Sequence, residues 1–456
     1  MMEVSDEYDS LIEKAIRDGK PRTETSLRRE KARVLEQIDG ADKRLRGVYA
    51  LPSDPDSMVH WLSQKARQYN YARFGAGFLV SSLTDISNLT LTSGFRSLGL
   101  NRLVKTLPIS SMADDEVRRM AVAAERVMHS SRTLKMNDIA DARGLLGIGE
   151  YGTFKHQVTS GVDRVMESLT NGVNVVSGMT AWNIRLKALA MVEIQHNVAE
   201  VIPKYSKLLE AASAGDKKAS LEVAKLASLG LGHEELSRIA KMMERFPPEK
   251  HEGVWELGAS RWMEVGRDGI RAAEDIQIAM ERASKRAVMT PGVGNVPLFM
   301  SHNFAKTLMQ FQTYGFVYVN NFLIPALQRV GAYGDYEALM SFGMSLALGA
   351  GVVIAKDMIR YGKVKERKPE SWAYDILDRS GALAYLSVPF GALTTAVSGN
   401  APSRYQMQKN IPQLLAGPTG GLVSDTVTAI TDPSLKNFHR IAPFKPLIDI
   451  GTQIFK

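Results

Sequence analysis

The last third of the chain contains three long runs without a formal charge, and no other feature constrains the fold as strongly. The runs span residues 307–328, 338–355 and 380–403. The middle run has 18 residues, and as a helix it would reach about 27 Å, just short of a hydrocarbon core. The third run is interrupted by Pro389. Each run therefore falls slightly below the pattern of a transmembrane helix, and two interpretations stay open, a buried core helix and a membrane-competent helix.

The first run divides into an apolar and a polar side when its residues are placed on a helix. The apolar side carries Phe304, Leu308, Phe311, Gly315, Phe322 and Ala326. The polar side carries Asn303, Lys306, Gln310, Thr313 and Asn320. Beyond Lys306 this side uses amides and hydroxyls, which are far less costly to bury than ions.

These faces predict which residues contact lipid and which contact water or protein. We expect an apolar stripe to contact membrane through Phe304, Leu308, Phe311 and Phe322, with Leu346 and Val352 from the middle run. We expect a lumen or a subunit interface to be lined by Gln310, Thr313 and Asn320.

A short basic cluster, KVKERK, follows the middle run at residues 363–368. Basic side chains beside an uncharged helix attract anionic lipid headgroups or DNA phosphates. We expect such contacts from Lys363, Lys365, Arg367 and Lys368. The alternative is an ordinary solvated loop.

The rest of the chain shows apolar residues at helical spacing. Residues 23–47 place one apolar face along Leu27, Val34, Ile38, Ala41 and Leu45. Similar patterns recur at 56–92, 112–131, 154–170, 178–212, 217–229, 233–246 and 255–288. Pro203 is expected to kink or split the run at 178–212. There is no sustained alternation of the kind strands show. The sequence predicts an all-α, extended multi-helix assembly with long amphipathic helices and marginally hydrophobic C-terminal helices.

Composition sets the class of protein and the position of a boundary. The chain has 456 residues, 45% hydrophobic and 23% charged, as in ordered globular proteins. Its net charge of +8 permits contact with nucleic acid or anionic lipid but is dilute, and the absence of cysteine excludes disulfides and thiolate chemistry. The pattern changes near Thr290, which predicts an N-terminal helical assembly domain at 1–287 and a C-terminal helical domain at 288–456.

The candidate motifs for catalysis, metals and cofactors in this sequence are incomplete. GIGEYG at 147–152 has dinucleotide-loop spacing but follows no predicted strand, and GHEEL at 232–236 lacks the second histidine of a zinc helix. The histidines are scattered, and His196 is expected to be packed or at the surface and not a ligand. We therefore expect no enzyme activity, no metal and no cofactor. An unrecognised peptidoglycan hydrolase is the opposing interpretation, for which Glu150 or Glu256 is the first residue to substitute.

Several short strings, in order along the chain, carry a family resemblance. They are TPGVGNVPLFM at 290–300, QFQTY at 310–314, LDRSG at 377–381, LAGPTGG at 415–421 and, upstream, SSLTDI at 81–86. Together they resemble the C-terminal region of the large internal virion proteins of short-tailed bacteriophages, also called DNA-ejection or ejectosome proteins. Asn295 departs from the aspartate expected there. The wall-cutting domain of longer relatives has no counterpart here and is not carried over.

The resemblance implies a function, partners and a location. Such proteins lie inside the virion, leave it on infection and form part of a trans-envelope conduit for genome delivery. The implied partners are further copies of the chain, other ejection proteins, the portal or tail, double-stranded DNA bound without sequence preference, and the host inner membrane. After ejection the expected location is the host periplasm and inner membrane. The alternative is a structural virion core or portal-associated protein that never inserts in a membrane.

Overall fold

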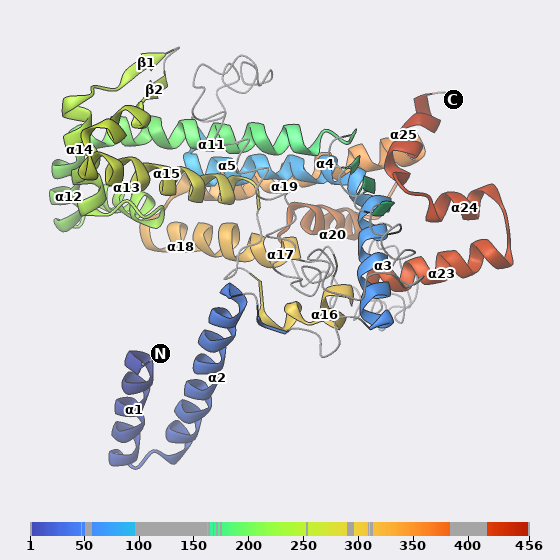
Figure 1. Ribbon diagram of the computed structural model, residues 1–456, viewed down its shortest axis with the longest axis horizontal. Coiled ribbons are helices and arrows are strands. Elements are labelled where there is room, and N and C mark those ends of the chain that lie inside the picture. Colours follow the sequence, from blue (N-terminus) through green and yellow to red (C-terminus); the bar gives the residue numbers. More distant parts are fainter. Residues whose placement is uncertain are drawn as a thin grey trace, which may run out of the picture.

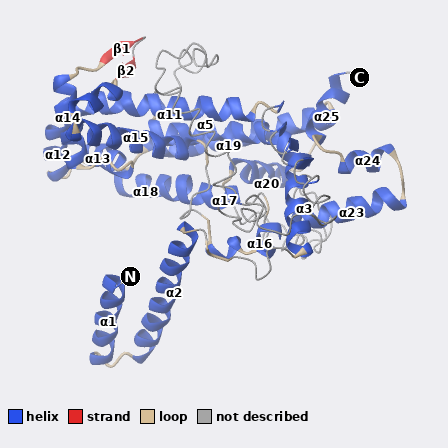
Figure 2. Ribbon diagram, in the orientation of Figure 1, coloured by secondary structure: helices blue, strands red, loops and turns tan. Residues whose placement is uncertain are grey.

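The computed structural model describes residues 2–46, 48–50, 57–95, 176–251, 254–289, 296–308, 310, 313–383 and 417–454, with a few positions between 162 and 173. Helices provide nearly all the regular structure of these residues, and the exception is one two-stranded hairpin (Figure 2). The predicted all-α fold is confirmed. The predicted helical run at 112–131, most of the run at 154–170 and most of the uncharged run at 380–403 lie outside the described residues.

The first helices are α1 (Met2–Arg17), α2 (Pro21–Leu45), α3 (Met58–Phe74), α4 (Phe78–Ser81) and α5 (Asp85–Ser93). The central elements are α11 (Met179–Val201), α12 (Tyr205–Ser213), α13 (Lys217–Ser228), α14 (His233–Arg245), β1 (Glu249–His251), β2 (Val254–Glu256) and α15 (Arg267–Ala287). The last helices are α16 (Asn303–Leu308), α17 (Thr313–Tyr318), α18 (Ile324–Tyr333), α19 (Tyr336–Tyr361), α20 (Pro369–Ser380), α23 (Gly417–Thr431), α24 (Leu435–Ile441) and α25 (Lys445–Ile454).

Helices α1 and α2 form an antiparallel hairpin that projects from the rest of the protein (Figure 1). Ile12 and Ala15 are buried in the seam between the two helices. The hairpin is anchored at the end of α2, where Arg44 donates hydrogen bonds to the carbonyl oxygens of Val296 at 2.6 Å and Pro297 at 2.8 Å. Gly40 lets the helix approach Leu298 closely, since an added Cβ would lie 2.5 Å from a Leu298 methyl carbon. The predicted amphipathic helix at 23–47 is confirmed.

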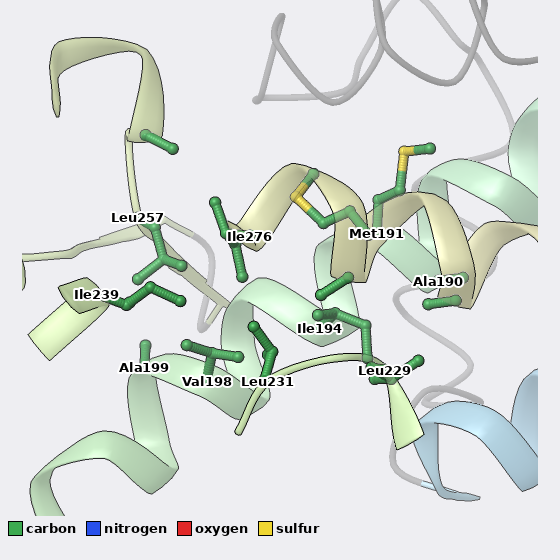
Figure 3. Close-up of a cluster of buried hydrophobic side chains, with 14 of the residues drawn as sticks. Ala190, Met191, Ile194, Val198, Ala199, Leu229, Leu231, Ile239, Leu257 and Ile276 are labelled. Atoms are coloured by element: carbon green, nitrogen blue, oxygen red, sulfur yellow. The ribbon is translucent and has the colours of Figure 1, made fainter. Parts of the chain in front are cut away.

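The largest hydrophobic core lies among α5, α11, α13, α14 and α15 (Figure 3). Helix α15 buries a continuous face and leaves charged residues outside, as its sequence pattern predicts. The buried face consists of Gly269, Ala272, Ala273, Ile276, Ala279, Met280, Ala283, Ser284 and Ala287. Trp262, from the 3₁₀ turn at Ala259–Val265, is fully buried against this core.

The breaks between central helices follow from local chemistry. Pro203 splits α11 from α12 through a 3₁₀ turn, as predicted, because its ring and missing N–H interrupt the helix. Asp216 begins α13 by accepting hydrogen bonds from the backbone N–H groups of Lys218 and Ala219. His196 is packed, as expected, and its Nδ1 accepts a hydrogen bond from the Trp255 backbone N–H at 3.2 Å.

Among its described residues, the first uncharged run is not one regular α-helix. It is divided among α16, α17, a π-helical turn at Val319–Leu323 and α18. Pro325 stands in the first turn of α18, where its ring cannot fit an ordinary α-helical turn before it. A π turn relieves such a clash by adding a residue. The prediction of one helical projection for 307–328 is therefore wrong.

Contacts cross the predicted boundary between 287 and 288 at several points. Helix α19 packs on α4 and α5, and α3 packs on α16, α23 and α25. The Thr90 hydroxyl donates to the Ser341 hydroxyl at 2.9 Å, and the Tyr69 hydroxyl donates to the Ile441 carbonyl at 2.6 Å. The change in composition at this boundary does not coincide with a break in packing within the described residues.

Candidate membrane-contacting helix

Helix α19 is the one helix among the described residues that is long and apolar enough to cross a membrane. A core helix of a soluble protein can meet the same criterion, but only a third of the most apolar 18-residue window of α19 is buried. The helix begins at Asp335, whose carboxylate accepts hydrogen bonds from the N–H groups of Glu337 and Ala338. It ends at Gly362, which adopts a left-handed conformation at φ 69°.

One side of α19 presents a stripe of apolar and small residues to the outside. Its members recur every three or four residues, so they share one face of the helix. We name them the outward stripe: Tyr336, Met340, Gly343, Ala347, Gly351, Ile354 and Met358. Met340 is 58% exposed and Met358 is 47% exposed, although each is a large apolar side chain. An added Cβ at Gly343 or Gly351 would meet nothing within 4 Å.

The opposite side of α19 is largely buried and partly polar. Its members also share one face, and we name them the inward row: Ala338, Ser341, Ser345, Gly349, Val352 and Lys356. The Ser345 hydroxyl donates to the Ser380 carbonyl oxygen at 2.9 Å and lies 3.0 Å from the Tyr318 hydroxyl. The Lys356 ammonium donates to the Ser81 hydroxyl at 2.7 Å. Hydrogen bonds as well as apolar contacts thus attach α19 to its neighbours.

The partner of the inward row on one side is α5, a short helix that is both polar and buried. Its buried residues include Asp85, Ser87, Asn88, Thr90 and Ser93. Burial raises the pKa of Asp85 from 3.8 to about 8, and the hydrogen bond that Asn88 Nδ2 donates at 2.9 Å opposes this rise only in part. Burial therefore favours the protonated, neutral form of the Asp85 carboxyl group in the folded protein.

On the other side, α19 crosses α20 at close range. An added Cβ at Gly349 would lie 2.9 Å from the Ile376 carbonyl oxygen and 2.9 Å from the Ser380 backbone nitrogen. Glycine therefore permits the two backbones to meet at this crossing. The same property brings Ser380 within hydrogen-bonding distance of Ser345.

The loop after α19 is held by a buried ion-pair cluster. The Arg367 guanidinium lies 2.7 Å from Asp357 and 3.0 Å from Asp375, and these three side chains are at most 1% exposed. Arg367 also lies over the Trp372 ring, 4.9 Å from its centre. The prediction that Arg367 contacts DNA or anionic lipid is contradicted in this structure. Helices α19 and α20 bring two carboxylates together, and these neutralise the guanidinium inside the protein.

The lysines of the basic cluster at 363–368 differ from Arg367, because none of them is buried. Lys363 and Lys368 are exposed at the surface. The Lys365 ammonium lies over the Tyr361 ring, 3.8 Å from its centre. Contacts of these three lysines with DNA or lipid stay a prediction.

Of the predicted membrane-contacting residues, the structure describes three side chains, and none of the three is exposed. Phe322 and Val352 are fully buried and Leu346 is partly buried, so in this conformation Phe322 and Val352 do not lie on the outside. Phe322 stacks on Tyr318 at 4.8 Å within a second core cluster, and Val352 belongs to the buried side of α19. Phe311 and the side chains of Phe304 and Leu308 lie outside the described residues. The sequence signal for the outward stripe is the recurrence from Tyr336 to Met358, which the length of a charge-free run does not reveal.

The predicted polar residues lie apart from one another. The Gln310 amide donates to the Arg67 carbonyl oxygen at 2.6 Å and accepts from Asn70 at 3.3 Å, which places it at an intramolecular interface with α3. Thr313 is partly buried, and Asn320 is exposed. The structure does not bring these three residues to one lumen-facing surface.

The geometry of α19 is suited to contact with other molecules along its exposed side. In the part of the chain that the structure describes, no group of three or more His, Asp or Glu side chains could hold a metal ion. The described site is a helix with an apolar outside and a hydrogen-bonded inside. Such a helix can contact lipid or another helix along its outward stripe while it keeps its polar contacts internal.

The chain was compared with protein-family models, with curated proteins and with solved structures, and none of the three comparisons gave a match.

Proposed function

We propose that this protein is a bacteriophage ejection protein that leaves the virion on infection and forms part of a trans-envelope conduit for genome delivery. The observation that carries the proposal is the distribution of side chains on α19. Its outward stripe, from Tyr336 to Met358, is apolar, and its inward row carries hydroxyl groups. The resemblance of the chain to internal virion proteins of short-tailed phages supplies the biological setting.

The polarity of α19 suits a protein that must exist in two environments. An exposed apolar stripe lowers the free energy when it moves from water into lipid, by about 25 cal/mol for each Å² of apolar surface. Ser341 and Ser345 already have hydrogen-bond partners inside the protein, so insertion does not require new partners for them. In this proposal the host inner membrane receives the outward stripe.

The remaining elements of the proposal follow from the same setting. The chain acts without catalysis and with no cofactor, as a homo-oligomer together with other ejection proteins and the portal or tail. Double-stranded DNA passes without sequence-specific contacts, because phosphate contacts carry no sequence information. The protein is located in the virion interior and later in the host periplasm and inner membrane.

A second candidate is a virion core or portal-associated protein that never enters lipid. It is favoured by Gly343, Ala347 and Gly351, whose spacing of four residues allows another helix to approach the outward stripe closely. In that case protein, and not lipid, covers the stripe.

Flotation of the full chain with liposomes of bacterial inner-membrane lipid separates these functions. The proposed function predicts flotation that resists high salt, together with dye release, because the binding is apolar. The double variant Met340→Glu/Ile354→Glu is expected to lose both properties. The matched control is Ile270→Glu/Ile278→Glu, which changes two exposed isoleucines of α15 and is expected to float as the wild type does. Flotation that salt abolishes, or equal loss in both variants, contradicts the proposed function.

A further inference from the structure

The α1–α2 hairpin carries two exposed faces of opposite charge. On α1, Glu3, Asp6 and Glu13 are exposed, with the exposed Ser10 between them. Their spacing of three, four and three residues places all of them on one helical face. We name this the acidic face of α1.

The basic face lies on α2. It consists of Arg22, Ser26, Arg29 and Arg33, which recur at intervals of four, three and four residues and are all exposed. Ser26, Arg22 and Arg29 also line a shallow surface hollow with Pro21 and Thr25. Further along α2, the same face docks at Gly40 and Arg44 on the rest of the protein, so the basic face continues a surface already used for packing.

The charged residues of these two faces lie outside the internal ion pairs of the hairpin. The hairpin uses other residues for its internal ion pairs, such as Lys31 with Asp9 and Arg28 with Glu24. Among the described residues no ion pair is recorded for the charged members of either face. Leu11 and Ile16 of α1 are also exposed, because two helices can bury only one seam between them.

We infer that the acidic face of α1 in one copy of this chain docks on the basic face of α2 in the next copy. In an antiparallel arrangement the two rows match position by position. Glu3 meets Arg33, Asp6 meets Arg29, Ser10 meets Ser26 and Glu13 meets Arg22. The rows also match in length, since ten residues from Glu3 to Glu13 rise about 15 Å and eleven from Arg22 to Arg33 rise about 16.5 Å.

The antiparallel arrangement has a consequence for symmetry. Helices α1 and α2 are already antiparallel within one hairpin. An antiparallel contact between copies then makes equivalent helices of neighbours parallel, as in a ring whose axis runs along the helices. Because the contact joins two different faces, it is heterologous and can close into a ring. The inference deepens the proposed function, since it rests on the homo-oligomer proposed there, but it does not require α19 to enter lipid.

The test uses charge reversal with exchange between the two faces. The full-length variant Arg22→Glu/Arg29→Glu/Arg33→Glu and the variant Glu3→Arg/Asp6→Arg/Glu13→Arg each place like charges opposite each other. Each is expected to weaken self-association at least tenfold in sedimentation equilibrium at low salt. A mixture of the two variants, or one chain carrying all six changes, restores opposite charges at the contacts and is expected to recover association.

The matched control is Lys207→Glu/Lys217→Glu/Lys218→Glu, which reverses three exposed lysines on α12 and α13 and is expected to associate as the wild type does. Recovery in the mixture distinguishes a specific contact from misfolding, because a misfolded variant is not rescued by its complement. A wild-type chain that stays monomeric, or a mixture that fails to associate, overturns the inference. So does unchanged assembly with lowered binding of duplex DNA by the arginine variant, which would assign the basic face to phosphates.

The same experiment keeps the two proposals apart. Association is measured without lipid, whereas salt-resistant flotation tests the outward stripe. A wild-type chain that stays monomeric but floats with liposomes overturns only the docking of hairpins. A wild-type chain that associates but does not float overturns only the membrane contact.

Discussion

Helices α15 and α19 are both long, but they differ in which residues they bury and which they expose. Helix α15 places alanines, Ile276 and Met280 inside and charged residues outside. Helix α19 places Ser341, Ser345 and Asp357 inside and leaves Met340 and Ile354 outside. The first is stabilised in water mainly by apolar burial. The second depends on paired polar groups, and its outside is suited to an apolar surrounding.

The difference teaches that length and hydrophobicity alone do not identify the role of a helix. The decisive property is which side of the helix the apolar residues occupy relative to the rest of the protein. In α15 the apolar side faces the core, and in α19 much of it faces outward.

The largest effect is expected where α19 meets its ion-pair cluster. Arg367→Met leaves Asp357 and Asp375 buried without their cation, so the free energy of unfolding should fall by about 4 kcal/mol. Urea denaturation measures this change. The exposed Lys363→Met in the same loop is the control and should change stability by less than about 0.5 kcal/mol. Equal midpoints for the two variants would show that the cluster does not hold the loop.

The next effect contrasts the two helices directly. Ile276→Ala removes a fully buried side chain of α15 and should lower the free energy of unfolding by about 3 kcal/mol. Met340→Ala on the outward stripe should change it by less than about 0.5 kcal/mol. Thermal unfolding in the absence of lipid measures both. Similar losses would mean that Met340 is covered in solution.

The third effect is a dependence on pH at the contact of α5 with α19. The pKa of Asp85 is raised to about 8 by burial, whereas the unfolded carboxyl ionises near 3.8. Its contribution to stability is thus fully present below about pH 4 and is lost as pH rises through 8. Asp85→Asn keeps a neutral side chain at every pH, so its stability relative to the wild type should rise progressively from pH 4 to pH 8, with little gain at pH 4.

Unfolding free energies measured from pH 4 to pH 9 check this expectation. The control is Asp268→Asn, at an exposed position in the first turn of α15. An unchanged slope in the Asp85 variant would mean that the carboxyl is ionised in the folded protein.

The smallest change in the free energy of unfolding is expected when one methyl group is added to the inward row or to the outward stripe. Gly349→Ala should lower the free energy of unfolding by about 1 kcal/mol, because its Cβ meets the backbone of α20. Gly351→Ala has open space around it and should stabilise the helix by about 0.5 kcal/mol. Calorimetry of the two variants measures the difference, and changes of the same sign would contradict the assigned faces.

Sequence periodicity predicted α2 and α15 because charges and apolar residues separate cleanly along them. The predicted run at 255–288 nevertheless began too early, since its first residues form part of β2 and a 3₁₀ turn before α15 begins at Arg267. Pro203 predicted the break between α11 and α12 for an equally local reason. The π turn at Val319–Leu323 was missed because Pro325 lies in an otherwise apolar helical pattern.

The internal polar contacts were not predictable in the same way. Arg367 finds Asp357 and Asp375 only because α19 and α20 fold back on each other, and no local pattern records this. The segment from Asp85 to Ser93 was predicted to be helical, but its many hydroxyls and amides gave no sign that it is buried. Burial there depends on complementary groups such as Ser341, which lies far away in the sequence.

The most direct measurement is of lipid contact along the outward stripe. The chain has no cysteine, so Met340→Cys, Ala347→Cys and Ile354→Cys can each carry one environment-sensitive fluorophore. Ile270→Cys on α15 is the matched control. With liposomes containing a quencher in the acyl chains, we expect blue-shifted, strongly quenched emission at the three α19 positions and neither change at position 270. Unquenched emission at all three positions, or equal quenching at position 270, would contradict insertion of the outward stripe into lipid.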